Sequence, residues 1–277
     1  MELVFYLFVI YGFFKITLDL YQIKFISTVT ITDKEMDKLS VDSDFIQNSN
    51  LYNTKKLELS ILSSVLSLII SYLIIFSSGI EIISSLSEKI GSNFIGKDLM
   101  VVLIFYLILT ILNLPVNYYK TFFIEQNFGF NKSTKSLFFR DFLISTVLSL
   151  IIVMSLFKAF EVIYYASQSL WWFYLWILFI FVNILTAYIY PTLIAPIFND
   201  FKKLEGGDLS ESISGLVKDT GFPLDDLYVM DGSKRSSHSN AYFTGMFGKK
   251  RIVFFDTLLT VLTVDEIKSV LAHEIGH

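Results

Sequence analysis

The end of the chain carries the residue pattern with the clearest chemistry. His273, Glu274 and His277 follow the pattern H-E-x-x-H. On a helix, residues four apart lie on one face, so the two imidazoles can hold one metal ion. Glu274 can reach a water molecule on that metal and act as a general base. The pattern predicts a metal-assisted hydrolytic site; the alternative is a helix that carries two ordinary histidines.

The residues before this pattern predict a helix over 263–277 with a defined start. Thr263 is a favourable N-cap, and Glu266, three residues later, completes a capping box. Asp265 adds negative charge to the first turn, where the helix dipole favours it. An apolar stripe follows, formed by Val264, Ile267, Val270 and Leu271.

The composition indicates a membrane protein. The chain has 277 residues, of which 53% are hydrophobic and 28 are phenylalanine, and its mean hydropathy is +0.59. These values are too high for a soluble globular domain. A net charge of -4 and the lack of a basic patch with interleaved aromatic residues argue against nucleic acid as a partner. The sequence has no cysteine, which excludes disulfides and cysteine-bound zinc.

Five apolar stretches approach or exceed the roughly 20 residues that cross a bilayer. They cover residues 3–20, 59–83, 99–119, 142–165 and 170–189. Lys15 interrupts the first stretch and Asp19 weakens it, whereas Trp171 and Trp172 open the last one, as expected at a membrane interface. We expect a retained first helix instead of a cleaved signal peptide, because no basic start and no small-residue cleavage site precede it.

The loops predict an orientation. Lysine and arginine are frequent in the loops after the first and third spans and sparse after the second and fourth. The N-terminus is therefore predicted outside or in the lumen, and everything after the fifth span in the cytoplasm. Polar residues at Asn113, Asn117, Lys120 and Asn183 indicate either a hydrated cavity or hydrogen bonds between helices.

The character of the chain changes after the fifth span. Pro191 and Pro196 are predicted to break the helix and lead the chain off the membrane. A helix over 208–219 and strands over 227–230, 241–243 and 251–255 are expected next, with a turn at 248–250 between the last two strands. The sequence thus predicts a membrane domain over 1–198 and a globular domain over 199–277.

Six pieces of sequence, in order, give the chain a resemblance to a known family. They are residues 114–119, 125–132, 190–198, 232–245 and 250–259, and the H-E-x-x-H helix. With them the chain resembles the CAAX prenyl proteases of the Ste24 type, which are membrane zinc metalloproteases of the M48 class. The part before residue 113 is similar in layout only.

The resemblance implies a mainly α fold, a polytopic bundle of seven membrane helices around a hydrated chamber, with five of them in this sequence. A small α+β zincin-like domain would close the chamber on the cytoplasmic side. His273 and His277 match the two zinc-binding histidines, and Glu274 matches the catalytic glutamate. The third ligand of the one Zn2+ ion is a glutamate on a later helix in the family, so we expect it beyond His277, in a longer protein.

The resemblance and a strand-like pattern also suggest where a substrate binds. Residues 239–243 are expected to form a strand beside the cleft, to which a peptide adds by backbone hydrogen bonds. Asn240, Ala241 and Tyr242 are the substrate-binding candidates. His238 is either a substrate contact or a loop histidine held by local hydrogen bonds, and the second interpretation is favoured.

Three functions remain open from the sequence. The first is a zinc endopeptidase of the Ste24 type, favoured by five spans before the metal helix. The second is a membrane protease of the HtpX type, and the third is an inactive membrane scaffold, against which the intact Glu274 argues. The partners would be the lipid bilayer and a peptide or protein substrate, prenylated if the membrane is the endoplasmic reticulum. In a bacterial inner membrane the role would be quality control of membrane proteins.

Overall fold

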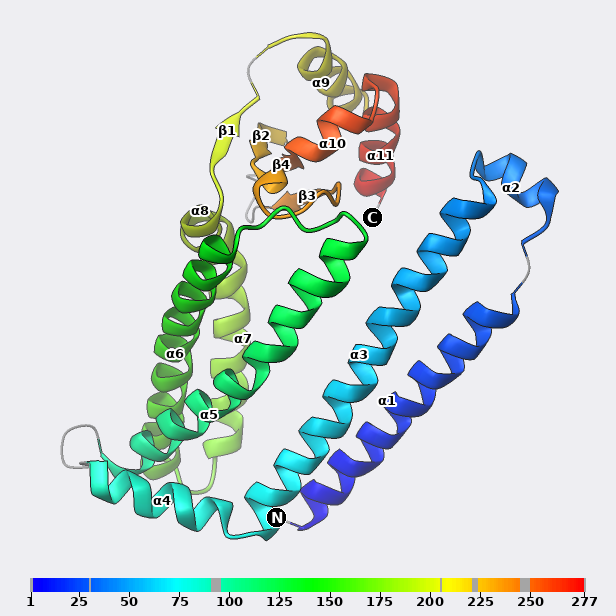
Figure 1. Cartoon of the computed structure of the whole chain (residues 1–277). Coiled ribbons are helices and arrows are strands. Elements are labelled where there is room, and N and C mark those ends of the chain that lie inside the picture. The colour runs from blue at the N-terminus through cyan, green and yellow to red at the C-terminus, as the bar shows by residue number, and fades with distance from the viewer. Residues whose placement is uncertain are drawn as a thin grey trace. The chain divides into compact units, whose positions relative to one another are not determined.

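The structure is a computed structural model that describes residues 2–29, 31–90, 96–204, 206–220, 224–244 and 250–276. It is mainly helical, with one small sheet near the C-terminal end (Figure 1). The chain divides into two compact units, which are Met1–Gly129 with Leu148–Ser155, and Phe130–Val147 with Leu156–His277. The predicted boundary after residue 198 divides the chain by sequence character instead and stays a prediction.

The first unit is built from helices, three of which are long and apolar enough to cross a membrane. They are α1 (Glu2–Thr28), α2 (Asp33–Leu39), α3 (Ser43–Phe76), α4 (Gly79–Ile90) and α5 (Lys97–Tyr119), which continues as the π-helical turn η1 (Lys120–Glu125). α1 and α3 lie side by side (Figure 1). Between them the Lys15 ammonium donates hydrogen bonds of 3.0 Å to the hydroxyls of Ser60 and Ser64. A cation in an apolar helix is tolerated here because a neighbouring helix supplies its acceptors.

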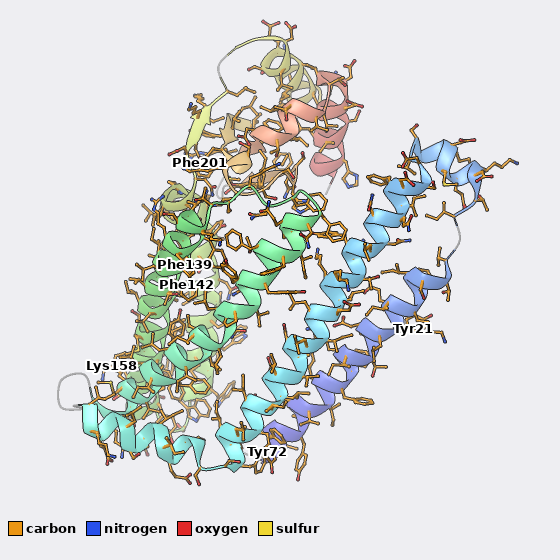
Figure 2. The ribbon with its side chains drawn as sticks, viewed as in Figure 1. Tyr21, Tyr72, Phe139, Phe142, Lys158 and Phe201 are labelled. Atoms are coloured by element: carbon orange, nitrogen blue, oxygen red, sulfur yellow. The ribbon has the colours of Figure 1, made fainter. Side chains whose placement is uncertain are left out.

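Five membrane spans are confirmed by the length and composition of the helices. The spans are Phe5–Thr28, Ser43–Phe76, Lys97–Glu125, Lys135–Ala166 and Trp171–Phe198. Large apolar side chains project from them along their length, and Tyr21 and Tyr72 are examples with 68% and 52% exposure (Figure 2). Such a surface is costly in water and suits a hydrocarbon environment.

The second span ends earlier than hydropathy predicted. The stretch 59–83 was expected to be one helix, but α3 ends at Phe76 and α4 begins at Gly79. The chain bends so tightly there that a Cβ on Gly79 would lie 2.5 Å from the Ile74 Cα and 2.9 Å from the Ile74 carbonyl oxygen. Only glycine fits this bend, and hydropathy does not register it because apolar residues continue on both sides.

Helix α6 (Lys135–Ala166) belongs to the second unit except for Leu148–Ser155. It is followed by α7 (Trp171–Ile189), η2 (Tyr190–Ile194) and α8 (Ala195–Phe198). The prediction that Pro191 and Pro196 break the helix was wrong, since helical turns continue to Phe198. Pro191 lies at the start of η2 and Pro196 at the start of α8, so each proline coincides with a change in the helical hydrogen-bond pattern. The chain accommodates them by widening to the π-helical turn η2.

A four-stranded sheet follows, with the order β1-β2-β4-β3. The strands are β1 (Phe201–Lys203), β2 (Leu224–Met230), β3 (Ala241–Thr244) and β4 (Lys250–Phe255). β2 and β4 are parallel, and the two outer pairs are antiparallel. The three predicted strands are confirmed, whereas the predicted turn at 248–250 lies largely outside the described residues.

Three helices pack on one face of this sheet. They are α9 (Asp208–Thr220), α10 (Asp256–Val261) and α11 (Val264–Gly276), and α9 confirms the predicted helix over 208–219. The buried core between sheet and helices consists of Ile213, Leu227, Ile252, Phe254, Leu258, Ile267 and Leu271. Ala241 and Phe243 of β3 pack against the same core, which therefore holds β3 and α11 on one framework.

The bend at Gly79 generates a test with two glycines. We expect Gly79→Ala to lower the free energy of unfolding by about 2 kcal/mol, because the added methyl group meets backbone atoms that cannot rotate away. Gly215→Ala is the control, since a Cβ there meets nothing within 4 Å inside α9. It should stabilise by about 0.5–1 kcal/mol. Thermal unfolding in detergent measures both, and an unchanged Gly79→Ala protein would contradict the described bend.

Candidate functional site

The helix that carries the metal-binding pattern starts as predicted. The Thr263 N–H donates to the Glu266 carboxylate at 2.8 Å, the Thr263 hydroxyl bonds to the same oxygen at 2.8 Å, and the Glu266 N–H donates to the Thr263 hydroxyl at 3.4 Å. These bonds from the Thr263 backbone and hydroxyl lower the pKa of Glu266. The capping box is therefore present, and α11 begins at a defined residue.

Packing decides which face of α11 is available for chemistry. Ile267 and Leu271 are buried in the core, at 2% and 0% exposure, whereas His273 is exposed. His273 lies about 200° round the helix from Leu271, and a helical residue four further on shares its side. The side of α11 that carries His273 thus faces away from the buried core.

Only part of the predicted metal site lies within the described structure. The backbone of Glu274 belongs to α11, but its side chain and the whole of His277 lie outside the described residues. Among the residues that are described, no three His, Asp or Glu side chains come close enough together to hold a metal ion. The assignment of His273, Glu274 and His277 therefore stays a prediction from sequence.

The predicted substrate strand lies at an edge of the sheet. β3 is the last strand in the sheet order and pairs with β4. The Phe255 N–H donates to the Asn240 carbonyl at 2.9 Å, which makes Asn240 and Phe255 a hydrogen-bonded pair. Because such pairs alternate along antiparallel strands, the backbone groups of Tyr242 point toward β4 and those of Ala241 point toward the outer edge.

The first residues of β3 have distinct environments. The Asn240 side-chain carbonyl accepts the Ala241 N–H at 2.9 Å, so this outward-pointing donor is satisfied within the chain. The ring of Tyr242 extends from the sheet face opposite the helices, and its burial, aided by the nearby Tyr190, raises the pKa of its hydroxyl. At ordinary pH this hydroxyl stays protonated and can donate a hydrogen bond.

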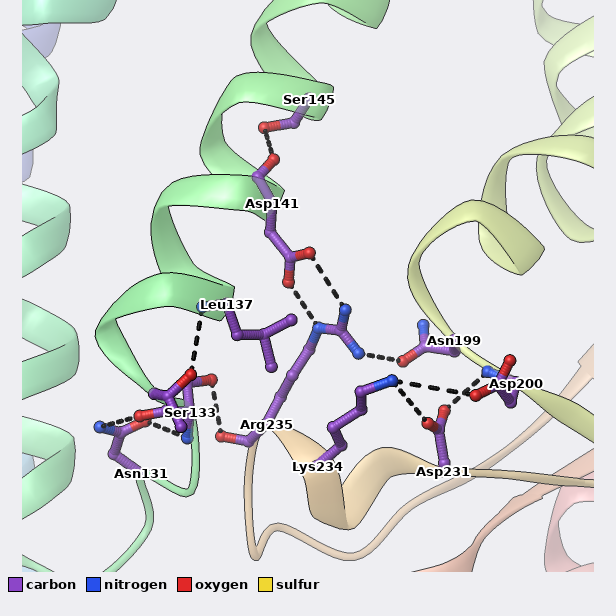
Figure 3. A network of polar contacts seen from close by, with 11 residues as sticks. Asn131, Ser133, Leu137, Asp141, Ser145, Asn199, Asp200, Asp231, Lys234 and Arg235 are labelled. Carbon is purple, nitrogen blue, oxygen red and sulfur yellow. Dashed lines mark hydrogen bonds and ion pairs between the residues drawn. The ribbon is translucent and has the colours of Figure 1, made fainter.

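A guanidinium fork anchors the loop that leads into β3 (Figure 3). The Arg235 Nε and Nη2 atoms donate to the two carboxylate oxygens of Asp141 on α6, at 2.7 and 3.1 Å. Arg235 Nη1 also donates to the Asn199 side-chain oxygen at 3.0 Å. Both charged side chains are only 22% exposed, so this bidentate pair is partly shielded from water.

Backbone bonds add to this anchor. The Arg235 carbonyl accepts the Lys132 N–H at 3.0 Å, and the Ser237 N–H donates to the Phe130 carbonyl at 3.0 Å. The loop over 231–240 is thereby held along its length although it contains only the short 3-10 turn η3 (Gly232–Lys234). Irregular backbone with this many partners is ordered enough to direct the strand that follows it.

His238 belongs to the same anchored loop. Its ring stacks on Phe130 with a centroid separation of 4.2 Å, and its carbonyl accepts the Thr257 hydroxyl at 3.0 Å. These contacts agree with the favoured interpretation of a loop histidine held by its neighbours. Sequence reasoning missed Arg235, Asp141 and Asn199, because no local spacing connects residues so far apart in the chain.

These observations define a class of protein: a polytopic membrane protein whose small α+β domain presents a metallopeptidase motif. Sequence models of two known families match the chain. Residues 22–200 match "CAAX prenyl protease N-terminal, five membrane helices", and residues 203–277 match "Peptidase family M48". The chain belongs to the CAAX prenyl proteases of peptidase family M48.

Three relatives place the chain within that family. It is 36% identical to the CAAX prenyl protease 1 homolog of Dictyostelium discoideum over 98% of this chain and 65% of the relative. It is 47% identical to CAAX prenyl protease 1 of Saccharomyces cerevisiae over 61% of this chain and 37% of the relative. The crystal structure of S. mikatae Ste24p superposes with a TM-score of 0.91 at 35% identity, covering 100% of this chain and 66% of that one. The chain thus spans two thirds or less of these relatives.

The guanidinium fork can be tested by a change that keeps the charge. We expect Arg235→Lys to lower the free energy of unfolding by about 2 kcal/mol, because an ammonium lacks the planar fork that bonds both carboxylate oxygens of Asp141 while a third N–H reaches Asn199. Lys158→Gln is the control, since it removes an exposed pair with Glu161 whose contribution is within about 0.5 kcal/mol. Equal unfolding temperatures for the two variants in detergent would show that the fork adds nothing.

Proposed function

We propose that the full protein is a membrane-embedded zinc metalloendopeptidase that removes C-terminal residues from prenylated proteins. One observation carries this proposal: α11, with the H-E-x-x-H pattern, and the edge strand β3 pack on the same buried core. A peptide on that edge would be held by the framework that also holds the catalytic helix. The membrane spans and the names of the relatives support the same function.

The donor set suits zinc. His273 lies on the exposed side of α11, and His277 follows at the spacing at which a helix brings two imidazoles together. They would supply two of the three protein ligands usual for catalytic zinc. When bound, zinc polarises the scissile carbonyl and makes water acidic enough to attack near neutral pH. Glu274 then has two tasks, to accept the proton of the attacking water and to pass it to the leaving amine nitrogen.

The substrate would bind as an added strand. The outer edge of β3 presents the backbone of Ala241, whereas Tyr242 is committed to β4. An incoming carbonyl would take the Ala241 N–H, which the Asn240 side chain now occupies, and release that side chain to contact the peptide. The three candidates thus have different tasks: Ala241 bonds the peptide, Asn240 exchanges a hydrogen bond, and Tyr242 fixes the strand.

The choice of substrate and membrane rests on the relatives. The two relatives named above are a CAAX prenyl protease 1 homolog and CAAX prenyl protease 1, and both come from eukaryotes. This supports prenylated proteins as substrates and the endoplasmic reticulum as the membrane, with the α+β domain in the cytoplasm as the basic loops predict. Quality control of unprenylated membrane proteins is the competing role. Equal cleavage of a farnesylated peptide and its unprenylated form would favour it.

Two variants separate metal binding from proton transfer in the full-length protein. We expect Glu274→Gln to reduce kcat by about 10²–10⁴-fold while zinc stays bound, because an amide cannot accept the proton. His273→Ala should lose the zinc as well as the activity. Asp265→Asn makes the same charge change on α11 and should cleave normally. Cleavage of a farnesylated peptide and zinc content by mass spectrometry measure both properties, and an active Glu274→Gln protein would refute the mechanism.

Proline substitution tests strand addition. We expect Ala241→Pro to raise KM at least about tenfold, because it removes an N–H that points away from β4 while the sheet keeps its own bonds. Lys203→Pro is the control on the opposite edge of the sheet. The Leu204 N–H donates to the Leu227 carbonyl, so the backbone of residue 203 also points outward. The variant also removes the Lys203–Asp226 ion pair, which joins β1 and β2 at the far side of the sheet from β3. If both variants cleave peptide with unchanged KM, the substrate does not add to β3.

A further inference from the structure

A cleft of 380 Å³ lies on the sheet face that the helices leave uncovered. Successive side chains of β4 point to opposite faces of the sheet. Ile252 and Phe254 enter the core, whereas Arg251 and Val253 line the cleft. Tyr242 of β3 reaches the cleft for the same reason. The cleft is therefore separated by the sheet from the proposed catalytic helix α11, and the proposed peptidase chemistry does not use it.

Arg251 gives the cleft a positive charge. Its guanidinium lies 5.6 Å from the centre of the Tyr228 ring, and among the described residues it forms no ion pair. Its neighbour across the strands is Asp226, but that carboxylate is paired with Lys203. Arg251 acts on Asp226 through charge alone, with no direct ion pair in the described structure, so this guanidinium on an aromatic ring keeps N–H donors for an anion.

Two further properties of the cleft limit the kind of anion that it can bind. The Tyr242 hydroxyl makes no hydrogen bond with another described residue, and burial keeps it protonated, so it is a donor. The rest of the lining is largely aromatic or apolar, with Tyr188, Pro191 and Phe201 among its members. Figure 2 labels Phe201 at the start of β1. Such walls favour an anion that carries an apolar or amphipathic body over a small hydrated ion.

The position of the cleft indicates where this ligand comes from. Its helical wall is formed by the last turns of the membrane span Trp171–Phe198. Tyr188 and Leu193 on these turns are 61% and 63% exposed, as expected for side chains at the boundary of a bilayer. The end of a membrane span is the level at which the phosphates of lipid headgroups lie.

We propose that this cleft binds the phosphate group of an anionic membrane lipid. Arg251 pairs with the phosphate, Tyr242 donates its hydroxyl to a phosphate oxygen, and the aromatic and proline walls contact the glycerol and the first acyl carbons. The site would tie the end of α7 to the sheet through a lipid. It does not depend on the proposed peptidase activity.

The experiment uses the whole chain in a neutral detergent and dihexanoyl phosphatidic acid as the probe. We expect binding by calorimetry that Arg251→Gln weakens about tenfold, the value of one charge-assisted hydrogen bond. Arg140→Gln removes the same charge from an exposed position on α6 and should bind the lipid like the unchanged protein. Arg251→Gln protein that binds the lipid with unchanged affinity would overturn the proposal.

A second variant covers the case in which Arg251→Gln fails to fold. Tyr242→Phe removes one hydroxyl with little change in packing and should weaken lipid binding about threefold. Inorganic phosphate tests whether a free anion is sufficient for binding. Dihexanoyl phosphatidylcholine tests whether the lipid must carry a net negative charge. If phosphate binds as tightly as phosphatidic acid, the lipid assignment is wrong. If Arg251→Gln weakens a peptide with a free C-terminal carboxylate and leaves the lipid unaffected, the cleft belongs to the peptide path and the proposal also fails.

Discussion

The bidentate pair between Arg235 and Asp141 is the contact on which the candidate site depends. The loop over 231–240 has almost no regular secondary structure, so its direction must come from side chains and from bonds to other segments. Arg235 supplies this direction by joining α6 and Asn199, and its carbonyl is held by Lys132. The loop then delivers Asn240 to the start of β3. The edge strand β3 is thus positioned by a charge pair with one partner on a membrane helix.

Elements coded by neighbouring residues were predictable from the sequence. The start of α11 follows from Thr263 and Glu266, three residues apart, and the five spans follow from sustained hydropathy. The end of the second span was not predictable in this way, because Gly79 is required by a contact with Ile74 across a bend while the apolar composition continues past it. The prediction of a break at Pro191 was wrong because the chain changes to the π-helical turn η2 there, and the local sequence does not announce this change.

The candidate site also combines features that neighbouring residues encode with features that depend on contacts between distant residues. The spacing of His273, Glu274 and His277 is a local pattern, and sequence alone is sufficient to nominate it. Arg235 and Asp141 are 94 residues apart, so their pairing has no local signal. The direction of the backbone groups in β3 also depends on a segment that is distant in the sequence. Whether the backbone of Ala241 or of Tyr242 faces outward depends on the register with β4, and a shift of one residue would exchange them.

That register also couples the two faces of the sheet. Ile252 and Phe254 seat α11, and Arg251 between β2 and β3 on the other face supplies the charge of the cleft beside the end of α7. A slip of one residue would place the guanidinium in the core and an isoleucine in the cleft, so the core beneath α11 and the cleft depend on the same register. A ligand that pairs with Arg251 stabilises only the native register. The same register places β3 beside the core that carries α11, so binding at the membrane end of the sheet favours the arrangement that the proposed peptidase site requires.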